Sequence, residues 1–418
     1  KGEWWEKNKK WAVIFWSALF IIPFAIKYGF MVAGEAVSEV IVGDYLTFIV
    51  LLFGLFCVAG NISLDGDLAG SPKVNVVMLL IGTLLSSWIG TTGASMLMIR
   101  PIIRANKWRS RKAQIIVFFI FLVSNIGGCL TPVGDPPLLM GFTYGIGFFW
   151  SLRLLPLMLL NTLILLIVFY VIDRRAYRKD LAAGLRPEVK ETHEPLRITG
   201  LHNIIFIILI VVAVILSGTL PKVNPVFGKG ITILGTTFSI ASMIEVALIL
   251  ISALLAFKTT KKKVRQKNHF TWDAIQEVAV LFIGIFMTMI PALMILKARG
   301  GDLGLTEPWQ YFWITGCLSS FLDNTPTYLV FFTTAASMGY TAGITTALGV
   351  IPKVTLMAIS VGAVFMGANT YIGNAPNFMV RSIAEENGIK MPSFFGYILW
   401  SLCILVPVFI IDMLVFFI

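Results

Sequence analysis

The chain has 418 residues, of which 57% are hydrophobic and 13% charged, and its mean hydropathy is +0.86. This composition excludes an ordinary soluble domain and predicts a polytopic membrane protein. The formal net charge is +11, but 18 of the 33 Lys and Arg residues lie in three short connections (104–112, 174–197 and 258–267), so the charge does not indicate a nucleic-acid partner.

Apolar segments of about 17 to 25 residues recur along the chain, which is the length of a helix that crosses roughly 30 Å of hydrocarbon. Strands of a membrane barrel would instead show short alternating segments. The chain does not begin with Met, and we expect a further N-terminal piece, such as another helix. The expected spanning helices are 11–29, 44–62, 113–150 (interrupted), 152–173, 201–219, 231–257, 272–296, 345–384 (interrupted) and 393–417.

Two further segments, 74–104 and 308–340, have a polar centre between two apolar arms. Arms of about 12 to 16 residues are too short to span comfortably, so we expect re-entrant hairpins. If the first helix runs from inside to outside and both hairpins return to the side from which they start, all three basic connections lie in the cytoplasm. The hairpin at 74 then opens inward and the hairpin at 308 opens outward.

The two halves of the chain show the same order of features. Residues 48–62 resemble 277–292 around Gly54 and Gly284, and a hairpin tip follows 38 residues later at Thr92 and 40 residues later at Asn324. An interrupted helix and a closing helix come next in each half. Chance similarity between apolar helices is the alternative, but the opposite orientations match the inverted repeats of secondary transporters.

The predicted fold is therefore an all-α polytopic membrane protein with inverted repeats, each containing a re-entrant hairpin and an interrupted helix. The expected organisation is scaffold helices (1–73), a first transport-domain half (74–173), a cytoplasmic linker (174–200), more scaffold helices (201–307) and a second transport-domain half (308–418).

Four polar elements interrupt the apolar sequence: the hairpin tips 91–95 and 322–327, and the helix breaks 124–128 and 368–376. A helix broken in hydrocarbon leaves unpaired backbone groups, so such breaks line a cavity. Hydroxyl and amide oxygens are hard ligands suited to Na⁺, although any one of these side chains could simply cap a helix. The candidate ion-binding residues are Thr91, Thr92, Ser95, Ser124, Asn125, Thr131, Asn324, Thr325, Asn369, Thr370 and Asn374.

Placing a carboxylate within the hydrocarbon layer costs free energy, so a carboxylate at that depth indicates a functional role. The candidates for exchange of a proton against the cation are Asp135, Asp323 and Glu277, with Glu245 behind them. Asp135 and Asp323 lie inside the polar elements. Glu277 lies a few residues into its helix, where an interfacial position is an equal alternative.

Three stretches carry a family resemblance: "SNIGGCLTPVGDPPLLMGF" (124–142), "IGTTGASMLMIRPIIRAN" (89–106) and "LDNTPTYLVFF" (322–332). They resemble the NhaD-type sodium/proton antiporters and the related citrate-transporter (CitMHS-like) proteins of the ion transporter superfamily. The resemblance covers most of the chain from about residue 44 onward. It implies an elevator-like motion, a homodimer, and roles in cation binding or exchange for Asn125, Asp135, Asp323 and Asn324. The first tip departs from the pattern because it lacks a carboxylate.

The leading functional hypothesis is a Na⁺(Li⁺)/H⁺ antiporter in a bacterial-type inner (plasma) membrane, with Na⁺ as transported ion and no organic cofactor. The alternatives are a sodium-coupled citrate or dicarboxylate symporter and, behind it, arsenite efflux. A channel or receptor fits inverted repeats with broken helices less well. We do not expect an enzyme, since the sequence contains no nucleophile–base pair, metal-ligand cluster or phosphate loop, and its four cysteines have no CxxC spacing.

Overall fold

The computed structural model describes residues 2–187, 197–268 and 270–418. Nine helical stretches in this part of the chain are long and apolar enough to cross a membrane, and strands are confined to three two-stranded ribbons. The prediction of an all-α polytopic membrane protein is confirmed.

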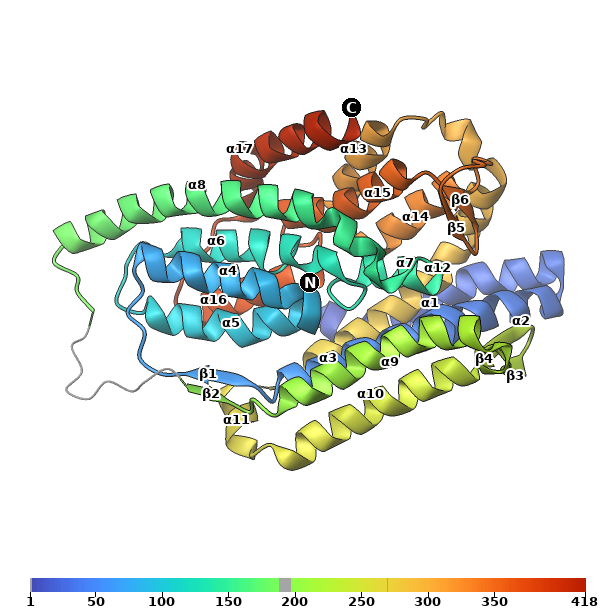
Figure 1. Cartoon of the computed structure of the whole chain (residues 1–418), viewed down its shortest axis with the longest axis horizontal. Helices are drawn as coiled ribbons and strands as arrows, with labels where there is room; N and C mark the ends of the chain where they lie inside the picture. The colour runs from blue at the N-terminus through green and yellow to red at the C-terminus, as the bar shows by residue number, and fades with distance from the viewer. Residues whose placement is uncertain (1, 188–196, 269) are drawn as a thin grey trace.

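One group of helices forms the lower right part of the molecule in Figure 1. Within it α10 packs against α9 and α3, and α1 packs against α12. The helical segment made of α2, η1 and α3 is almost unbroken. The helix expected at 44–62 therefore begins well before residue 44. The members are α1 (Gly2–Tyr28), α2 (Phe30–Ser38), the π-helix η1 (Glu39–Tyr45), α3 (Leu46–Ala59), α9 (Asn203–Val223), α10 (Ile240–Thr259) and α12 (Asp273–Arg299).

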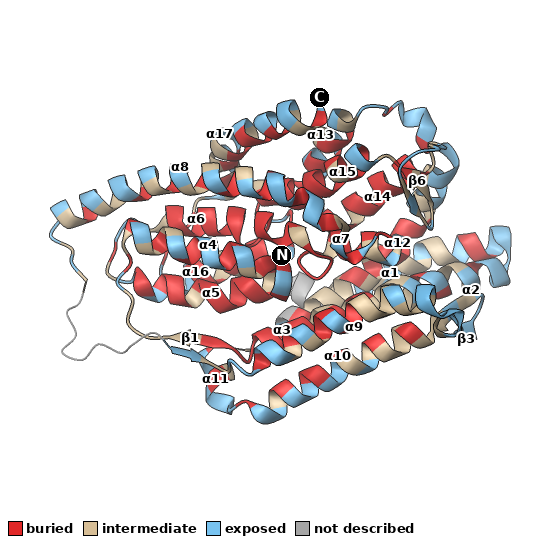
Figure 2. Ribbon diagram, in the orientation of Figure 1, coloured by how far each residue is buried: buried red, intermediate tan, exposed pale blue. Residues whose placement is uncertain are grey.

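The second group contains the two hairpins and the two interrupted helices. Its centre is α6, whose residues 114–122 are all buried (Figure 2), as expected for a helix that is apolar on every side. The members are α4 (Pro72–Ile89), α5 (Thr91–Ala105), α6 (Ala113–Leu122), η2 (Ile126–Leu130), α7 (Pro136–Thr143), η3 (Phe148–Leu154), α8 (Leu155–Ala182), α13 (Pro308–Ser319), α14 (Asn324–Ala336), α15 (Lys353–Met366), η6 (Gly367–Asn369), α16 (Ala375–Glu386), α17 (Phe394–Asp412) and η7 (Met413–Phe417).

Hairpin 1 consists of α4 and α5, and it enters and leaves the bundle at the same end. Its base is closed by a hydrogen bond from the Gly70 N–H to the Ala105 carbonyl (2.7 Å). Its tip is Gly90, whose φ of 79° is a conformation that glycine adopts readily. The first arm is longer than expected, since α4 has 18 residues. Hairpin 2, formed by α13 and α14, opens toward the opposite end of the molecule (Figure 1).

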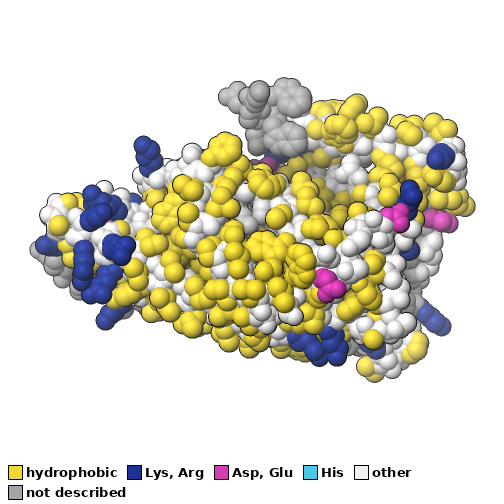
Figure 3. All heavy atoms as spheres, turned by 90° about the horizontal axis from the view of Figure 1, so that it is seen from above, with side chains coloured by type: hydrophobic (Ala, Val, Ile, Leu, Met, Phe, Trp, Pro, Cys, Tyr) yellow, Lys and Arg dark blue, Asp and Glu magenta, His cyan; other side chains and the backbone are white. Residues whose placement is uncertain are grey.

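The three basic connections lie together at one end, as the predicted topology requires. Strand β1 (Ser63–Asp65) contacts all of them. Arg104 donates to the Leu64 carbonyl, β2 (Arg197–Thr199) pairs with β1, and Lys267 lies 2.9 Å from the Asp65 carboxylate. Figure 3 shows Lys and Arg side chains gathered at this end, where α8 finishes. The positive-inside rule predicts that this end faces the cytoplasm.

Two expected helices begin later than predicted, because each is preceded by a β-ribbon. The ribbons are β3 (Gly230–Ile233) with β4 (Thr236–Ser239), and β5 (Ile344–Thr346) with β6 (Gly349–Ile351). The strands are rich in Ile, Val and Thr, and a glycine lies at or beside each turn, with Leu234 and Gly235 both at positive φ in the first. Helices α10 and α15 start directly afterwards.

The linker is shorter than predicted, because α8 continues through 174–182. Residues 188–196 of the linker lie outside the described residues. The remaining short elements are η4 (Pro225–Gly228), α11 (Lys262–Lys267) and η5 (Gly300–Leu303).

Candidate functional site

The first interrupted helix is held open by hairpin 1. Between α6 and α7 the chain forms η2 and an extended stretch, which leaves backbone groups without helical partners. The Ser87 hydroxyl, near the tip of α4, donates to the Gly127 carbonyl (2.5 Å) and accepts from the Leu130 N–H (3.0 Å). Thr131 in turn donates its hydroxyl to the Ser87 carbonyl. The hairpin thus supplies the hydrogen bonds that the broken helix lacks.

The second interrupted helix repeats this arrangement with hairpin 2. The Ser320 hydroxyl lies 3.1 Å from the Met366 carbonyl and accepts from Asn369 Nδ2 (2.9 Å). Thr370 donates its hydroxyl to the Ser320 carbonyl. The side chains of Thr131, Asn369 and Thr370 therefore fix the breaks to the hairpins.

A glycine in each break allows the backbone to fold back on itself. A Cβ atom at Gly134 would lie 2.2 Å from the Gly128 carbonyl oxygen, and one at Gly373 would lie 2.5 Å from the Gly367 carbonyl oxygen. Any side chain at either position would force the break apart. The residue after each of these glycines is consequently placed in the same way.

Those next residues are Asp135 and Asn374, and they are the N-caps of α7 and α16. Their backbone conformations nearly coincide, with φ, ψ of −145°, 140° and −151°, 142°. The two residues are structural counterparts in the two halves of the chain. Their side chains meet, since Asn374 Nδ2 donates to Asp135 Oδ1 at 3.2 Å.

Asp135 is 1% exposed and accepts hydrogen bonds from three elements. Oδ1 accepts from the Thr91 hydroxyl (2.9 Å) as well as from Asn374, and Oδ2 accepts from Asn324 Nδ2 (2.6 Å). Thr91 begins α5 at the tip of hairpin 1, and Asn324 begins α14 at the tip of hairpin 2. The structure therefore brings both tips and both breaks to one buried carboxylate.

A second set of amides and hydroxyls extends this cluster. Asn125 Nδ2 donates to Asn377 Oδ1 (2.7 Å), and Asn374 Nδ2 lies 3.1 Å from the Ser124 carbonyl. The hydroxyls of Ser95 and Ser124 are 2.8 Å apart. Asn374 Nδ2 also lies 3.3 Å from Asn125 Oδ1, so these side chains belong to the same hydrogen-bonded cluster as Asp135.

Other predicted residues lie beside this cluster. Asp323 caps α14, and its carboxylate accepts from the Thr325 N–H at 3.0 Å. The Thr325 hydroxyl lies 3.4 Å from Asn324 Oδ1. Thr92 is partly exposed at the start of α5. Asp323 precedes Asn324, which contacts Asp135, so the second carboxylate lies near the first. Its own hydrogen-bond partner is the Thr325 N–H.

Glu277 lies apart, on α12 in the other group of helices. Its carboxylate is 3.8 Å from Lys9 Nζ and its side chain is 42% exposed. Glu245 is buried in α10 and interacts with Ser217. These positions favour the interfacial interpretation of Glu277.

Asn377 and the two serines that fix the breaks, Ser87 and Ser320, are not among the residues predicted from the sequence. Asn377 follows Asn374 by three residues, so one turn of helix puts both on the same face. A Ser-Ser pair precedes each hairpin tip, at 86–87 and at 319–320. The repetition of this pair in both halves was the sequence signal that could have identified Ser87 and Ser320.

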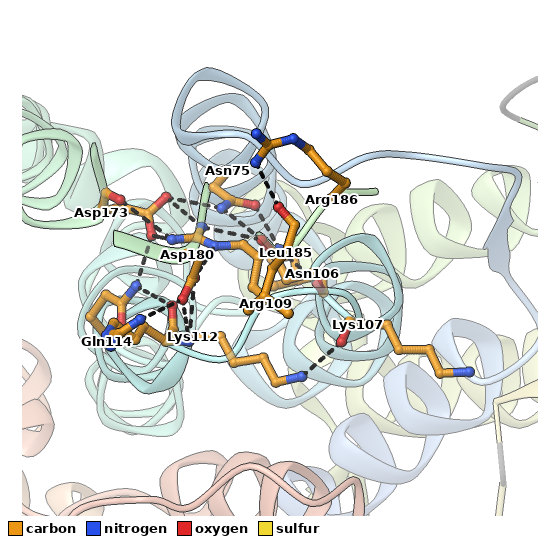
Figure 4. A network of polar contacts seen from close by, with 12 residues as sticks. Asn75, Asn106, Lys107, Arg109, Lys112, Gln114, Asp173, Asp180, Leu185 and Arg186 are labelled. Carbon is orange, nitrogen blue, oxygen red and sulfur yellow. Dashed lines mark hydrogen bonds and ion pairs between the residues drawn. The ribbon is translucent and has the colours of Figure 1, made fainter. Parts of the chain in front are cut away.

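A buried polar network anchors the base of hairpin 1 to α8 (Figure 4). The Arg109 guanidinium lies 2.8 Å from an Asp173 carboxylate oxygen and 3.4 Å from one of Asp180, and all three side chains are fully buried. Asn75 Nδ2 donates to Asn106 Oδ1 (3.0 Å) and lies 3.1 Å from Asp173. Both arms of the hairpin are thereby attached to one long helix.

The chemical groups of the cluster are compatible with either a proton or a small cation. A carboxylate, hydroxyls, amides and backbone carbonyls provide only oxygen ligands, which suit a hard cation such as Na⁺. The four polar elements contain no Lys or Arg. The N-termini of α5, α7, α14 and α16 also meet here, and helix N-termini favour negative charge, including that of Asp135 itself.

Comparison with known proteins places this chain in a family. A family model described as "Putative citrate transport" matches residues 1–417, which is nearly the whole chain. No curated protein matches the sequence. The chain therefore belongs to this citrate-transport family and is a multi-pass membrane protein of transporter type, which confirms the family resemblance given by the sequence.

Proposed function

We propose that this member of the citrate-transport family is a secondary transporter that exchanges Na⁺ (or Li⁺) for H⁺ at Asp135. The observation that carries the proposal is the position of this buried carboxylate, where it accepts hydrogen bonds from both hairpin tips and from the second helix break. The three donors, Thr91, Asn324 and Asn374, are all neutral. None of them is a cationic side chain that would compete with a bound cation for the negative charge of Asp135.

Exchange follows from competition for one group. A protonated Asp135 can donate a hydrogen bond to the oxygen of the Thr91 hydroxyl, since a hydroxyl oxygen can accept hydrogen bonds. A Na⁺ ion would displace that proton, and rotation of the Asn324 or Asn374 amide would present oxygen in place of nitrogen. The two states exclude each other at Asp135, and this exclusion gives antiport.

We propose further that the hairpin-containing group moves against α1–α3, α9, α10 and α12. The interface between the two groups of helices is compatible with one group sliding along the other. It is apolar, because Phe56 of α3 packs with Met96 of α5 and Ile275 of α12 in one cluster. Small residues also meet there, since a Cβ at Gly93 would lie 3.1 Å from Ala59 Cβ. A homodimer, a bacterial-type plasma membrane location and the predicted domain limits belong to the same proposal.

Sodium-coupled transport of citrate or a dicarboxylate is the second candidate. Two observations favour it: the family description, and the four helix N-termini that meet at the site. Asp135 and Asp323 oppose it, since two carboxylates repel a polycarboxylate unless Na⁺ lies between them.

One assay separates the candidates. Proteoliposomes with an imposed pH gradient receive NaCl without any organic anion, and a pH-sensitive dye reports proton movement. The antiporter dissipates the gradient, and Asp135→Asn abolishes the response. The matched control is Asp302→Asn, the same chemical change in an exposed ion pair with Arg299. Proton movement that requires citrate or succinate would contradict the antiporter and support the symporter.

A further inference from the structure

A second carboxylate is buried in the membrane-spanning region, outside the site around Asp135. Asp412 lies near the end of α17, within a segment long and apolar enough to span, and is 0% exposed. Its partner is Asn161 of α8, also 0% exposed. The contact joins the closing helix of one half to the closing helix of the other.

The hydrogen bonds of this pair are incomplete. Asn161 Nδ2 lies 2.8 Å from both Asp412 carboxylate oxygens and also donates to the Leu157 carbonyl at 2.9 Å. One N–H is therefore shared by two oxygens that together can accept about four hydrogen bonds. Asn161 Oδ1 is buried and has no hydrogen-bond partner among the described residues. A buried acceptor without a donor is rare in folded proteins.

Among the described residues, none offers a compensating charge to an ionised Asp412. In the described part of the chain Asn161 is the one side chain that interacts with its carboxylate. Aromatic rings lie nearby, with Phe312 packing against Phe409 and Phe417. The ionisable groups on the packed elements α8, α13, α15 and α17 are Tyr170, Asp173, Tyr177 and the charged residues that follow Asp173, Tyr311, Cys317, Lys353, Tyr397 and Cys403.

A single proton on Asp412 removes both its uncompensated charge and the missing hydrogen bond to Asn161 Oδ1. A protonated Asp412 can donate its O–H to Asn161 Oδ1 while Asn161 Nδ2 donates to the other Asp412 oxygen, after a small sideways shift of the amide. The pair then forms a closed ring of two hydrogen bonds, and no charge remains in the apolar surroundings. A cation in the same place would instead need the amide reversed, which would turn both Nδ2 hydrogens away from Asp412 and Leu157.

We propose that Asp412 and Asn161 form a second proton-binding site, in which the carboxylic acid of Asp412 shares its proton with the Asn161 amide. The site is separate from Asp135 and does not depend on which ion or anion the protein transports. It adds a membrane-embedded proton at the junction of the two closing helices.

Infrared spectroscopy of the full chain in lipid at neutral pH tests this inference. A protonated carboxylic acid gives a C=O stretching band, separate from those of carboxylates and amides, that shifts in D₂O. We expect Asp412→Asn to remove one such band. Asn161→Leu should retain the band but move it to higher frequency, because the acid loses its hydrogen bonds. Asp135→Asn serves as the comparison and should leave the Asp412 band in place.

The inference is overturned if the acid region of the spectrum is the same in the wild type and Asp412→Asn. It is equally overturned if Asp412→Asn reduces the number of ²²Na⁺ ions bound per chain by one, since Asp412 would then hold a cation. Asp412→Asn preserves shape and can still pair amide to amide. Should it fail to fold, the band shift in Asn161→Leu decides alone.

Discussion

Asn374 Nδ2 donates a hydrogen bond to Asp135 Oδ1 at 3.2 Å, although the two residues are 239 positions apart. They cap equivalent helices with nearly equal backbone angles, so the contact lies where the two halves of the chain are related to each other. One half contributes a carboxylate and the other an amide. The centre of the cluster therefore contains one carboxyl group, which matches a single proton or a single monovalent cation.

Thr91 should control how tightly the cation binds. Thr91→Val removes the hydroxyl that donates to Asp135 and leaves the shape almost unchanged. A hydrogen bond to a charged group contributes about 1.5 to 3 kcal/mol, so the NaCl concentration for half-maximal proton movement should rise about ten-fold or more. Thr91→Ser keeps the hydroxyl and should remain close to wild type. Equal affinities for the Val and Ser variants would exclude this role.

The two packed glycines should be indispensable, and for the same reason. In Gly134→Ala and Gly373→Ala the new methyl group would meet a carbonyl oxygen at 2.2 and 2.5 Å. The break must then shift, which displaces Asp135 or Asn374, and NaCl-driven proton movement should be lost in both variants. Gly147→Ala is the control, because no described residue would lie within 4 Å of a Cβ added there and its φ is −64°. Activity in Gly134→Ala would show that the break tolerates a side chain.

Arg109 should be a major source of stability in the hairpin group. Arg109→Gln leaves Asp173 and Asp180 buried without their cation, which costs about 3 to 5 kcal/mol. We expect a large fall in the unfolding temperature in detergent. Arg111→Gln is the matched control, since the Arg111 side chain is 49% exposed and its ion pair should contribute about 1 kcal/mol or less. Similar effects of the two changes would contradict the assignment.

Asp65 should stabilise the end that carries the basic connections, in a pH-dependent way. Partial burial raises the pKa of Asp65, but the hydrogen bond and charge of Lys267, together with the hydroxyls of Ser63 and Thr199, outweigh it and hold the pKa below its usual value of 3.8. A lowered pKa means that the contribution is complete above the ordinary pKa and is lost as the pH falls through the lowered one. Asp65→Asn should therefore unfold at a lower temperature than wild type at neutral pH, and the difference should close in strong acid. A difference that stays constant with pH would argue against the ion pair.

Much of the architecture was predictable, because its causes are local. Apolar runs of spanning length, the polar tip expected at 91–95 and the Gly- and Pro-rich breaks are composition signals that predict helices, hairpins and interruptions. The turn itself lies just before the expected tip, at Gly90. The placement of the basic connections at one end followed from their charge together with the two re-entrant hairpins. These signals located the segments that contain Asp135 and Asn374.

The missed features depend on contacts between distant segments. Ser87 and Ser320 act through carbonyls that become available only when the neighbouring helix is broken. Asp412 stands in an apolar closing helix, and its importance depends on Asn161, which is 251 residues away. The β-ribbons before α10 and α15 were missed because runs of Ile, Val and Thr are equally compatible with a buried helix when only hydropathy is considered.

The most direct test of the account moves the central carboxylate across the contact between the repeats. NaCl-driven proton movement is measured in proteoliposomes for wild type, Asp135→Asn and the double variant Asp135→Asn/Asn374→Asp, each at matched protein content. We predict full activity, none, and partial recovery respectively, because the exchanged carboxylate stays within the same set of neutral donors. Wild-type proton movement by Asp135→Asn alone would contradict the account.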